Sequence, residues 1–123
     1  MADIMLTTSG GGIGYSAGAG GAVTQLTSKA TGVTINKLTG AITMHNAALA
    51  AAAEVNFTVT NSTVGATDAI VVNHASAGTA GAYAIHAHTI AAGSFRIMVG
   101  NMSAGSLSEA IVIRYAVIKS VSA

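Results

Sequence analysis

Charge is the property that this 123-residue sequence has least of. Only 7% of its residues are charged, against 51% that are hydrophobic, whereas roughly a quarter of a typical soluble domain is charged. A domain of this length still exposes much of its surface, so the exterior must consist largely of Ala, Gly, Ser, Thr and Asn. Weakly polar surface costs little to desolvate, which favours a component of a larger protein assembly.

Basic residues are few and scattered, which argues against one class of partner. Nucleic-acid binding needs a cluster of cations that neutralises phosphates. The chain has five basic residues in no such cluster: Lys29, Lys37, Arg96, Arg114 and Lys119. We therefore expect no nucleic-acid partner.

Cysteine and proline are both absent. Without cysteine there is no disulfide, no thiolate nucleophile and no cysteine-based zinc site, so stability must come from packing and association. Proline and lysine are residues that protect exposed edge strands from pairing, and lysine is scarce here too. We therefore expect occupied strand edges and a homo-oligomer, a dimer or a trimer.

Long apolar runs and a secretory signal are also lacking. Residues 1–6 show no basic stretch followed by a sustained apolar one. The alanine run at 47–53 stops at Glu54, well short of the ~20 residues of a membrane-spanning helix. Alternating strands are compatible with a closed membrane barrel, but with two Phe and three Tyr the chain lacks the aromatic girdles typical of one. We expect synthesis in a cytoplasm and no membrane partner.

Glycine divides the chain into two parts. Residues 9–21 are so rich in glycine that they lose too much backbone entropy to hold one conformation unaided. The sequence therefore predicts an N-terminal arm over 1–21, ordered by contact with a partner, and a β domain over 22–123.

Short runs rich in Val, Ile and Thr recur about every ten residues after the arm, a pattern typical of a sandwich or barrel. In 54–60, Val55, Phe57 and Val59 alternate with polar residues and are expected to face the core. Residues 46–53 are equally compatible with a short helix and a tight connection. The expected strands, about eight, cover 22–26, 33–36, 41–45, 54–60, 69–73, 82–90, 95–99 and 110–119.

Chemistry-bearing motifs are weak. His86 and His88 share one face of an expected strand and could bind a metal if His45 or His74 converged on them, but no carboxylate is near them in sequence. The glycines of 10–21 lack the flanking strand and helix of a phosphate loop. The four acids, Asp3, Glu54, Asp68 and Glu109, show no catalytic spacing. We expect no catalytic residue, cofactor site or metal site, and no enzyme activity.

Four segments carry a resemblance to a known family. GAVTQLTSKATGVTINK (21–37), GAITM (40–44), EVNFTVTNS (54–62) and SAGSLSEA (103–110) with the strand after it resemble small virion proteins of tailed bacteriophages, the head decoration or cement proteins. The resemblance implies a jelly-roll-like β-sandwich that binds the major capsid protein on the outer surface of the phage head and stabilises the shell. It also implies a location in the virion.

Two other functions compete with this interpretation. A phage fibre or adhesion module would present its loops to a host-surface glycan, and such a site requires an aromatic-lined pocket. A cupin-like metal enzyme would use His86 and His88 and requires an acidic ligand beside them. The sequence offers few aromatics for the former and no neighbouring acid for the latter.

Overall fold

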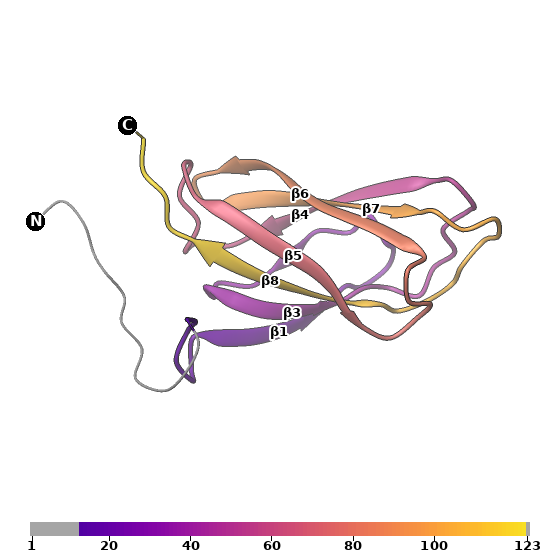
Figure 1. Cartoon of the computed structure of the whole chain (residues 1–123), viewed down its shortest axis with the longest axis horizontal. Helices are drawn as coiled ribbons and strands as arrows, with labels where there is room; N and C mark the ends of the chain where they lie inside the picture. The colour runs from indigo at the N-terminus through magenta and orange to yellow at the C-terminus, as the bar shows by residue number, and fades with distance from the viewer. Residues whose placement is uncertain (1–12, 123) are drawn as a thin grey trace, which may run out of the picture.

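A computed structural model describes residues 13–122 as a β-sandwich of two four-stranded sheets (Figure 1). The first sheet has the order β1-β3-β8-β5 and the second the order β2-β4-β7-β6. The strands are β1 (Gly20–Thr24), β2 (Val33–Thr34), β3 (Thr39–Thr43), β4 (Glu54–Thr60), β5 (Ala69–Ser76), β6 (Tyr83–Ala91), β7 (Ser94–Asn101) and β8 (Val112–Ile118). A helix that could cross a membrane is not found in this part of the chain.

The expected all-β sandwich of about eight strands is confirmed. Both sheets are mixed, because β1 runs parallel to β3 and β2 runs parallel to β4, while the remaining pairs are antiparallel. An all-antiparallel jelly roll would not contain these two parallel pairs. We therefore describe the fold as a mixed β-sandwich.

The core lies between the sheets and follows the alternation of the strands. In β4, Phe57 and Val59 are buried as expected, whereas Val55 is only half-buried near the end of the sandwich. In β8, Ile113, Tyr115 and Val117 face inward in the same way. Aromatic contact across the core joins Phe95 to Tyr115, with ring centroids 5.7 Å apart.

Residues 46–53 form a connection and not a helix. Leu49 is buried and bridges to Leu107 through reciprocal backbone hydrogen bonds of 2.8 and 3.0 Å. Ala52 adopts a positive φ of 60° in the turn before β4. Pairing with the 101–108 segment and burial of Leu49 thus override the helix propensity of alanine.

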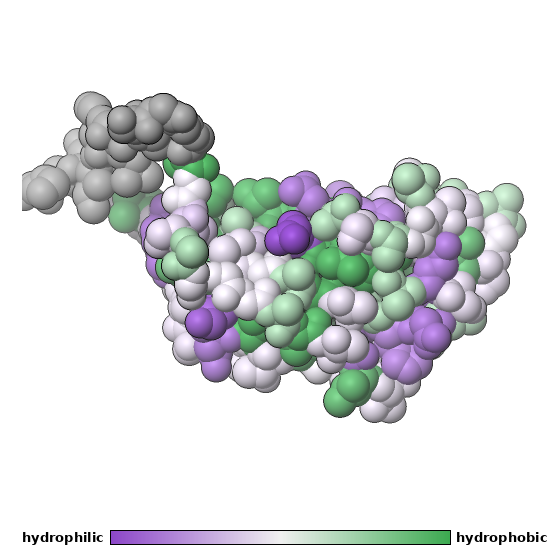
Figure 2. All heavy atoms as spheres, turned by 90° about the horizontal axis from the view of Figure 1, so that it is seen from below, coloured by the Kyte–Doolittle hydropathy of each residue, from purple (hydrophilic) through white to green (hydrophobic). Residues whose placement is uncertain are grey.

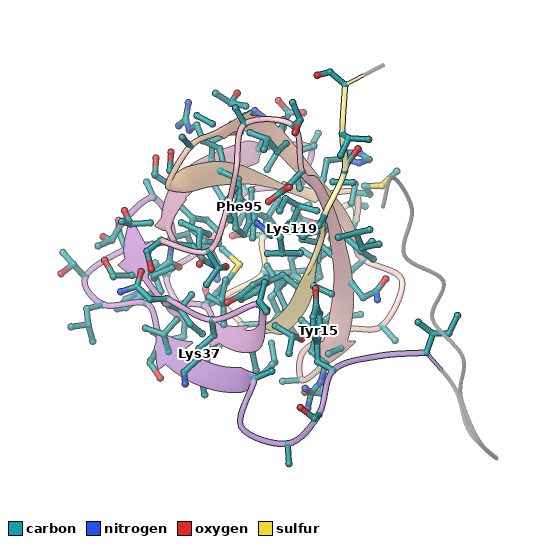
Figure 3. The ribbon with its side chains drawn as sticks, turned by 90° about the vertical axis from the view of Figure 1, so that its left-hand side faces the viewer. Tyr15, Lys37, Phe95 and Lys119 are labelled. Atoms are coloured by element: carbon teal, nitrogen blue, oxygen red, sulfur yellow. The ribbon has the colours of Figure 1, made fainter. Side chains whose placement is uncertain are left out.

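The first strand begins at Gly20, two residues earlier than expected, so Gly20 and Gly21 belong to β1. Just before it, the Tyr15 hydroxyl donates a hydrogen bond to the carbonyl of Val117 in β8 (Figure 3). The rest of the expected arm, 1–12, lies outside the described residues. Within 13–19, Tyr15 is therefore a direct attachment of the arm to the sandwich.

Candidate functional site

The outward face of the first sheet carries very little charge. Strand alternation and register place twelve side chains on it, of which only Arg114 is charged. They are Ala22, Thr24, Thr39, Ala41, Thr43, Ala69, Val71, Asn73, Val112, Arg114, Ala116 and Ile118. We call these residues the first-sheet face.

Small and β-branched residues predominate on this face, and no aromatic residue interrupts it. Val71 and Ile118 are 44% and 51% exposed beside each other at its β5 end. Figure 2, which views the molecule from the side where β1 lies in Figure 1, shows strongly hydrophilic residues only in separate spots. Removing water from this surface costs little free energy, because almost no charged group on it would lose its hydration.

Strand β5 leaves one backbone edge without a strand partner. The backbone amide of Val117 in β8 donates to the carbonyl of Leu38, on the β3 side. Backbone groups of successive residues point to opposite sides of a strand, so those of the residues before and after Val117 point toward β5 and bond to it. Ile70 and Val72 of β5 are paired with the β8 residues whose backbone groups point away from β5. The backbone groups of Ile70 and Val72 therefore point to the free edge of β5. No charged residue or proline lies within Ala69–Ser76, so this edge lacks the usual protection against pairing.

The outward face of the second sheet is hollowed around Gly100 in β7. The hollow has a volume of about 420 Å³, and its lining includes Glu54, His86, Met98 and Met102. Register explains why they meet, because Glu54 and Ala84 flank Gly100 on either side, while His86 pairs with Met98. Glycine at this position leaves the space open, since a Cβ there would lie 3.8 Å from the Met98 Sδ atom.

The two histidines singled out from the sequence have different surroundings. His88 is engaged, with Nε2 2.7 Å from Asn56 Oδ1 and Nδ1 2.8 Å from Thr89 Oγ1. His86 is exposed and makes no hydrogen bond within residues 13–122. Neither histidine belongs to a group of three or more His, Asp or Glu residues in the described part of the chain.

An acidic residue from another strand shares the surroundings of His86. Glu54 is far from it in sequence, yet both line the hollow around Gly100. The reason is the pairing of β4, β7 and β6 side by side, which only the folded sheet specifies. The sequence signal that could have indicated the hollow is Gly100 placed between outward-facing Met98 and Met102 at alternate positions.

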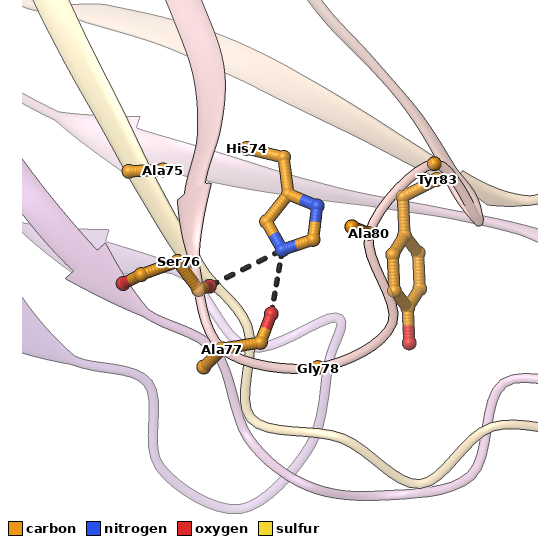
Figure 4. Close-up of a pocket in the computed structure, with 8 residues that line it drawn as sticks. His74, Ala75, Ser76, Ala77, Gly78, Ala80 and Tyr83 are labelled. Carbon is orange, nitrogen blue, oxygen red and sulfur yellow. Dashed lines mark hydrogen bonds between the residues drawn. The ribbon is translucent and has the colours of Figure 1, made fainter.

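A second hollow, of about 360 Å³, lies at the β5–β6 connection (Figure 4). His74 Nε2 is 2.6 Å from the Ala77 carbonyl and 3.2 Å from the Ser76 carbonyl, so this nitrogen carries the proton and donates. The His74 and Tyr83 rings meet edge to face, with centroids 5.6 Å apart.

Glu109 anchors the same connection from the segment before β8. Its carboxylate accepts hydrogen bonds from the Tyr83 hydroxyl at 2.7 Å, the Thr79 amide at 3.0 Å and the Thr79 hydroxyl at 2.9 Å. The bond from Tyr83, followed by those from Thr79, lowers the pKa of Glu109, while burial and the neighbouring carboxylate raise the pKa of Tyr83. All carboxylate contacts are used to hold the loop, so this arrangement is a structural anchor.

Comparison of the chain with protein-family models, with curated proteins and with solved structures finds no significant match to any of them. These comparisons therefore assign no family to this chain.

Proposed function

We propose that this protein is a structural subunit that attaches to a larger protein assembly through the first-sheet face, and that the assembly is the outer surface of a bacteriophage head. The observation that carries the proposal is a β-sheet surface with a single charge, Arg114, among twelve outward side chains. The sequence resemblance to decoration proteins supplies the identity of the assembly, with the major capsid protein as partner.

Binding of this kind stabilises a shell without a chemical step. A subunit that bridges capsid proteins binds only the assembled state, so it shifts the equilibrium toward the intact shell by an amount that grows with occupancy. An oligomer gains further because, once one copy is attached, the others act at a high effective concentration.

Self-association would extend the same surface. We propose that two copies pair antiparallel through β5, with Val72 opposite its equivalent in the second copy. Ile70 and Val72 present unpaired backbone donors and acceptors at this edge, and no charge in β5 opposes pairing. The result would be one continuous eight-stranded sheet whose outward face has twice the area and only the two copies of Arg114 as charges.

The test uses phage heads stripped of this protein. Stripped heads are expected to release DNA at a lower temperature than complete heads, and adding the purified protein is expected to restore them in a saturable way. Ala116→Lys, which places a charge at the centre of the first-sheet face, should abolish restoration. Thr60→Lys, at an exposed end of β4 in the other sheet, is the matched control and should restore fully.

Two results would overturn the proposal. Stripped heads that are as heat-resistant as complete heads but no longer adsorb to host cells would favour the adhesion module. Equal restoration by Ala116→Lys and the wild type would show that the first-sheet face is not the attachment surface.

A further inference from the structure

Four potential metal ligands converge on the hollow around Gly100, on the opposite side of the sandwich from the first-sheet face. Its rim holds two thioethers, from Met98 and Met102, an imidazole from His86, and a carboxylate from Glu54. Within residues 13–122 neither the His86 side chain nor the Glu54 side chain forms a hydrogen bond or an ion pair. The polar donors of the hollow are therefore available to a ligand.

The surroundings of Gly100 show that the side chains of Met98 and Glu54 lie close to it. A Cβ built on Gly100 would lie 3.8 Å from Met98 Sδ and 3.9 Å from Glu54 Cγ, so both side chains lean over the same point. His86 is the cross-strand partner of Met98, and side chains in that relation have Cβ atoms about 4.5–5.5 Å apart. The Met98 sulfur thus lies near Gly100, and His86 and Glu54 line the same hollow from the neighbouring strands.

Met102 completes the set from the segment after β7. Its amide bonds to the Ala82 carbonyl at 2.8 Å, which fixes its backbone beside β6. Its side chain is 72% exposed and lines the hollow, so it has no packing role that would explain a long apolar side chain here. The thioether of Met102 and the imidazole of His86 thus line the same hollow, and neither is needed to hold the fold together.

The kinds of ligand atom in the hollow indicate which metal ion it would bind. Thioether sulfur is a soft ligand that prefers Cu(I), whereas Ca²⁺ and Mg²⁺ require oxygen ligands and Zn²⁺ takes thiolate, imidazole and carboxylate. We propose that this hollow binds a soft monovalent cation, Cu(I), through the sulfurs of Met98 and Met102 and a ring nitrogen of His86. Glu54 offsets the positive charge. Metal binding here is independent of attachment to a phage head, because the two surfaces lie on different sheets.

Silver ion is the probe, because Ag(I) has the same charge and a similar ligand preference and does not change oxidation state in air. The full-length protein is titrated with Ag(I) by calorimetry, while the methionine methyl resonances are followed by NMR. We expect one site, with the methyl signals of Met98 and Met102 shifting together with the ring signals of His86.

Three variants separate this site from other methionines. Met98→Leu combined with Met102→Leu keeps the apolar volume and should weaken Ag(I) binding by at least about tenfold, as should His86→Gln, given that even outer-shell changes cost about 10–100-fold. Met44→Leu changes a methionine that is 1% exposed in the core and should bind as the wild type does. Thermal melting confirms that each variant is folded.

The proposal fails if the double methionine variant binds Ag(I) as tightly as the wild type, because the ion is then held elsewhere. It also fails if Zn²⁺ competes with Ag(I) on equal terms and the methionine variants do not affect the competition, because the site would then be one for borderline cations. Neither result would affect the proposed attachment surface, which is tested by Ala116→Lys with Thr60→Lys as its control.

Discussion

Lys29 is the one charged residue among the buried polar side chains of the described chain, which also include Gln25, Asn61 and Asn101. Its ammonium group donates to the carbonyls of His45 and Glu109, which ties the β1–β2 connection to the two segments that flank the β3–β8 pair. Burial lowers the pKa of Lys29, and the charge of Glu109 partly opposes this. The buried ammonium group of Lys29 thus holds three loops together.

Phe57 is the residue whose removal should cost the most. It is 1% exposed at the centre of β4, so Phe57→Ala is expected to lower the free energy of unfolding by about 3–5 kcal/mol. Leu26→Ala, at a side chain that is 69% exposed, is the control and should change it by less than about 0.5 kcal/mol. Urea denaturation of both variants measures the difference, and equal midpoints would contradict the assigned core.

Tyr115 should make the protein sensitive to alkali. Its hydroxyl donates to the Lys37 carbonyl at 2.6 Å and accepts from the Asn61 amide at 3.2 Å, and burial raises its pKa from 10.0 to about 12. Because the folded pKa is the higher one, this contribution to stability is complete below pH 10 and is lost as the pH rises through about 12.

Tyr115→Phe is therefore expected to be less stable than the wild type near pH 8, by about 1–3 kcal/mol for the lost hydrogen bonds. Between about pH 10 and pH 12 the variant should lose less stability than the wild type, because one raised ionisation has been removed. Urea denaturation across this range checks both statements. Parallel losses in the two proteins would show that Tyr115 is not responsible.

At the scale of elements, the β5–β6 connection shows how one acid organises a glycine-rich loop. Gly78 has a φ of 72°, and a Cβ on it would lie 2.7 Å from Ile111 Cγ2 and 3.0 Å from the Glu109 carboxylate. Glycine is therefore required at 78 both by the backbone angle and by the close approach of the anchoring segment.

Comparison of two glycines in this loop separates these causes. Gly81 also has a positive φ, 78°, but has open space around it, so Gly81→Ala should cost only the backbone strain of about 1–2 kcal/mol. Gly78→Ala should cost more, because it displaces Ile111 or Glu109 as well. Melting temperatures of the two variants rank them, and a smaller loss for Gly78→Ala would contradict the packing described.

Strand β8 explains why the sequence shows its longest β pattern at the end of the chain. It lies between β3 and β5 in the first sheet, and its inward residues are fully buried. Its outward residues, by contrast, are half-buried or exposed. The outward residues Val112, Ala116 and Ile118 are apolar, and the proposed attachment surface includes them.

For the whole molecule, the central question is self-association. The homo-oligomer remains a prediction, and the free edge of β5 gives it a location that can be tested. Val71→Lys adds the kind of charge that protects natural edge strands at an outward side chain that is 44% exposed. It is expected to convert the oligomer into monomers while leaving the core intact.

Sedimentation velocity of wild type and variant is the measurement, with Thr60→Lys as the charge-matched control on the second sheet. The control should sediment as the wild type does. A wild type that is monomeric at micromolar concentration would refute self-association altogether. An oligomer unaffected by Val71→Lys would place the interface on another surface.

Local pattern alone predicted an all-β sandwich or barrel, the extent of β4 and the inward positions of Phe57 and Val59, because alternation along a strand depends only on neighbouring residues. Composition alone indicated a weakly charged exterior. The order of strands, the parallel pairs, the role of Lys29 and the convergence of Glu54 with His86 and Met98 were decided by the tertiary structure. These features depend on which strands lie side by side, and pairing between distant segments is set by the packing of the whole core, which no local stretch of sequence encodes.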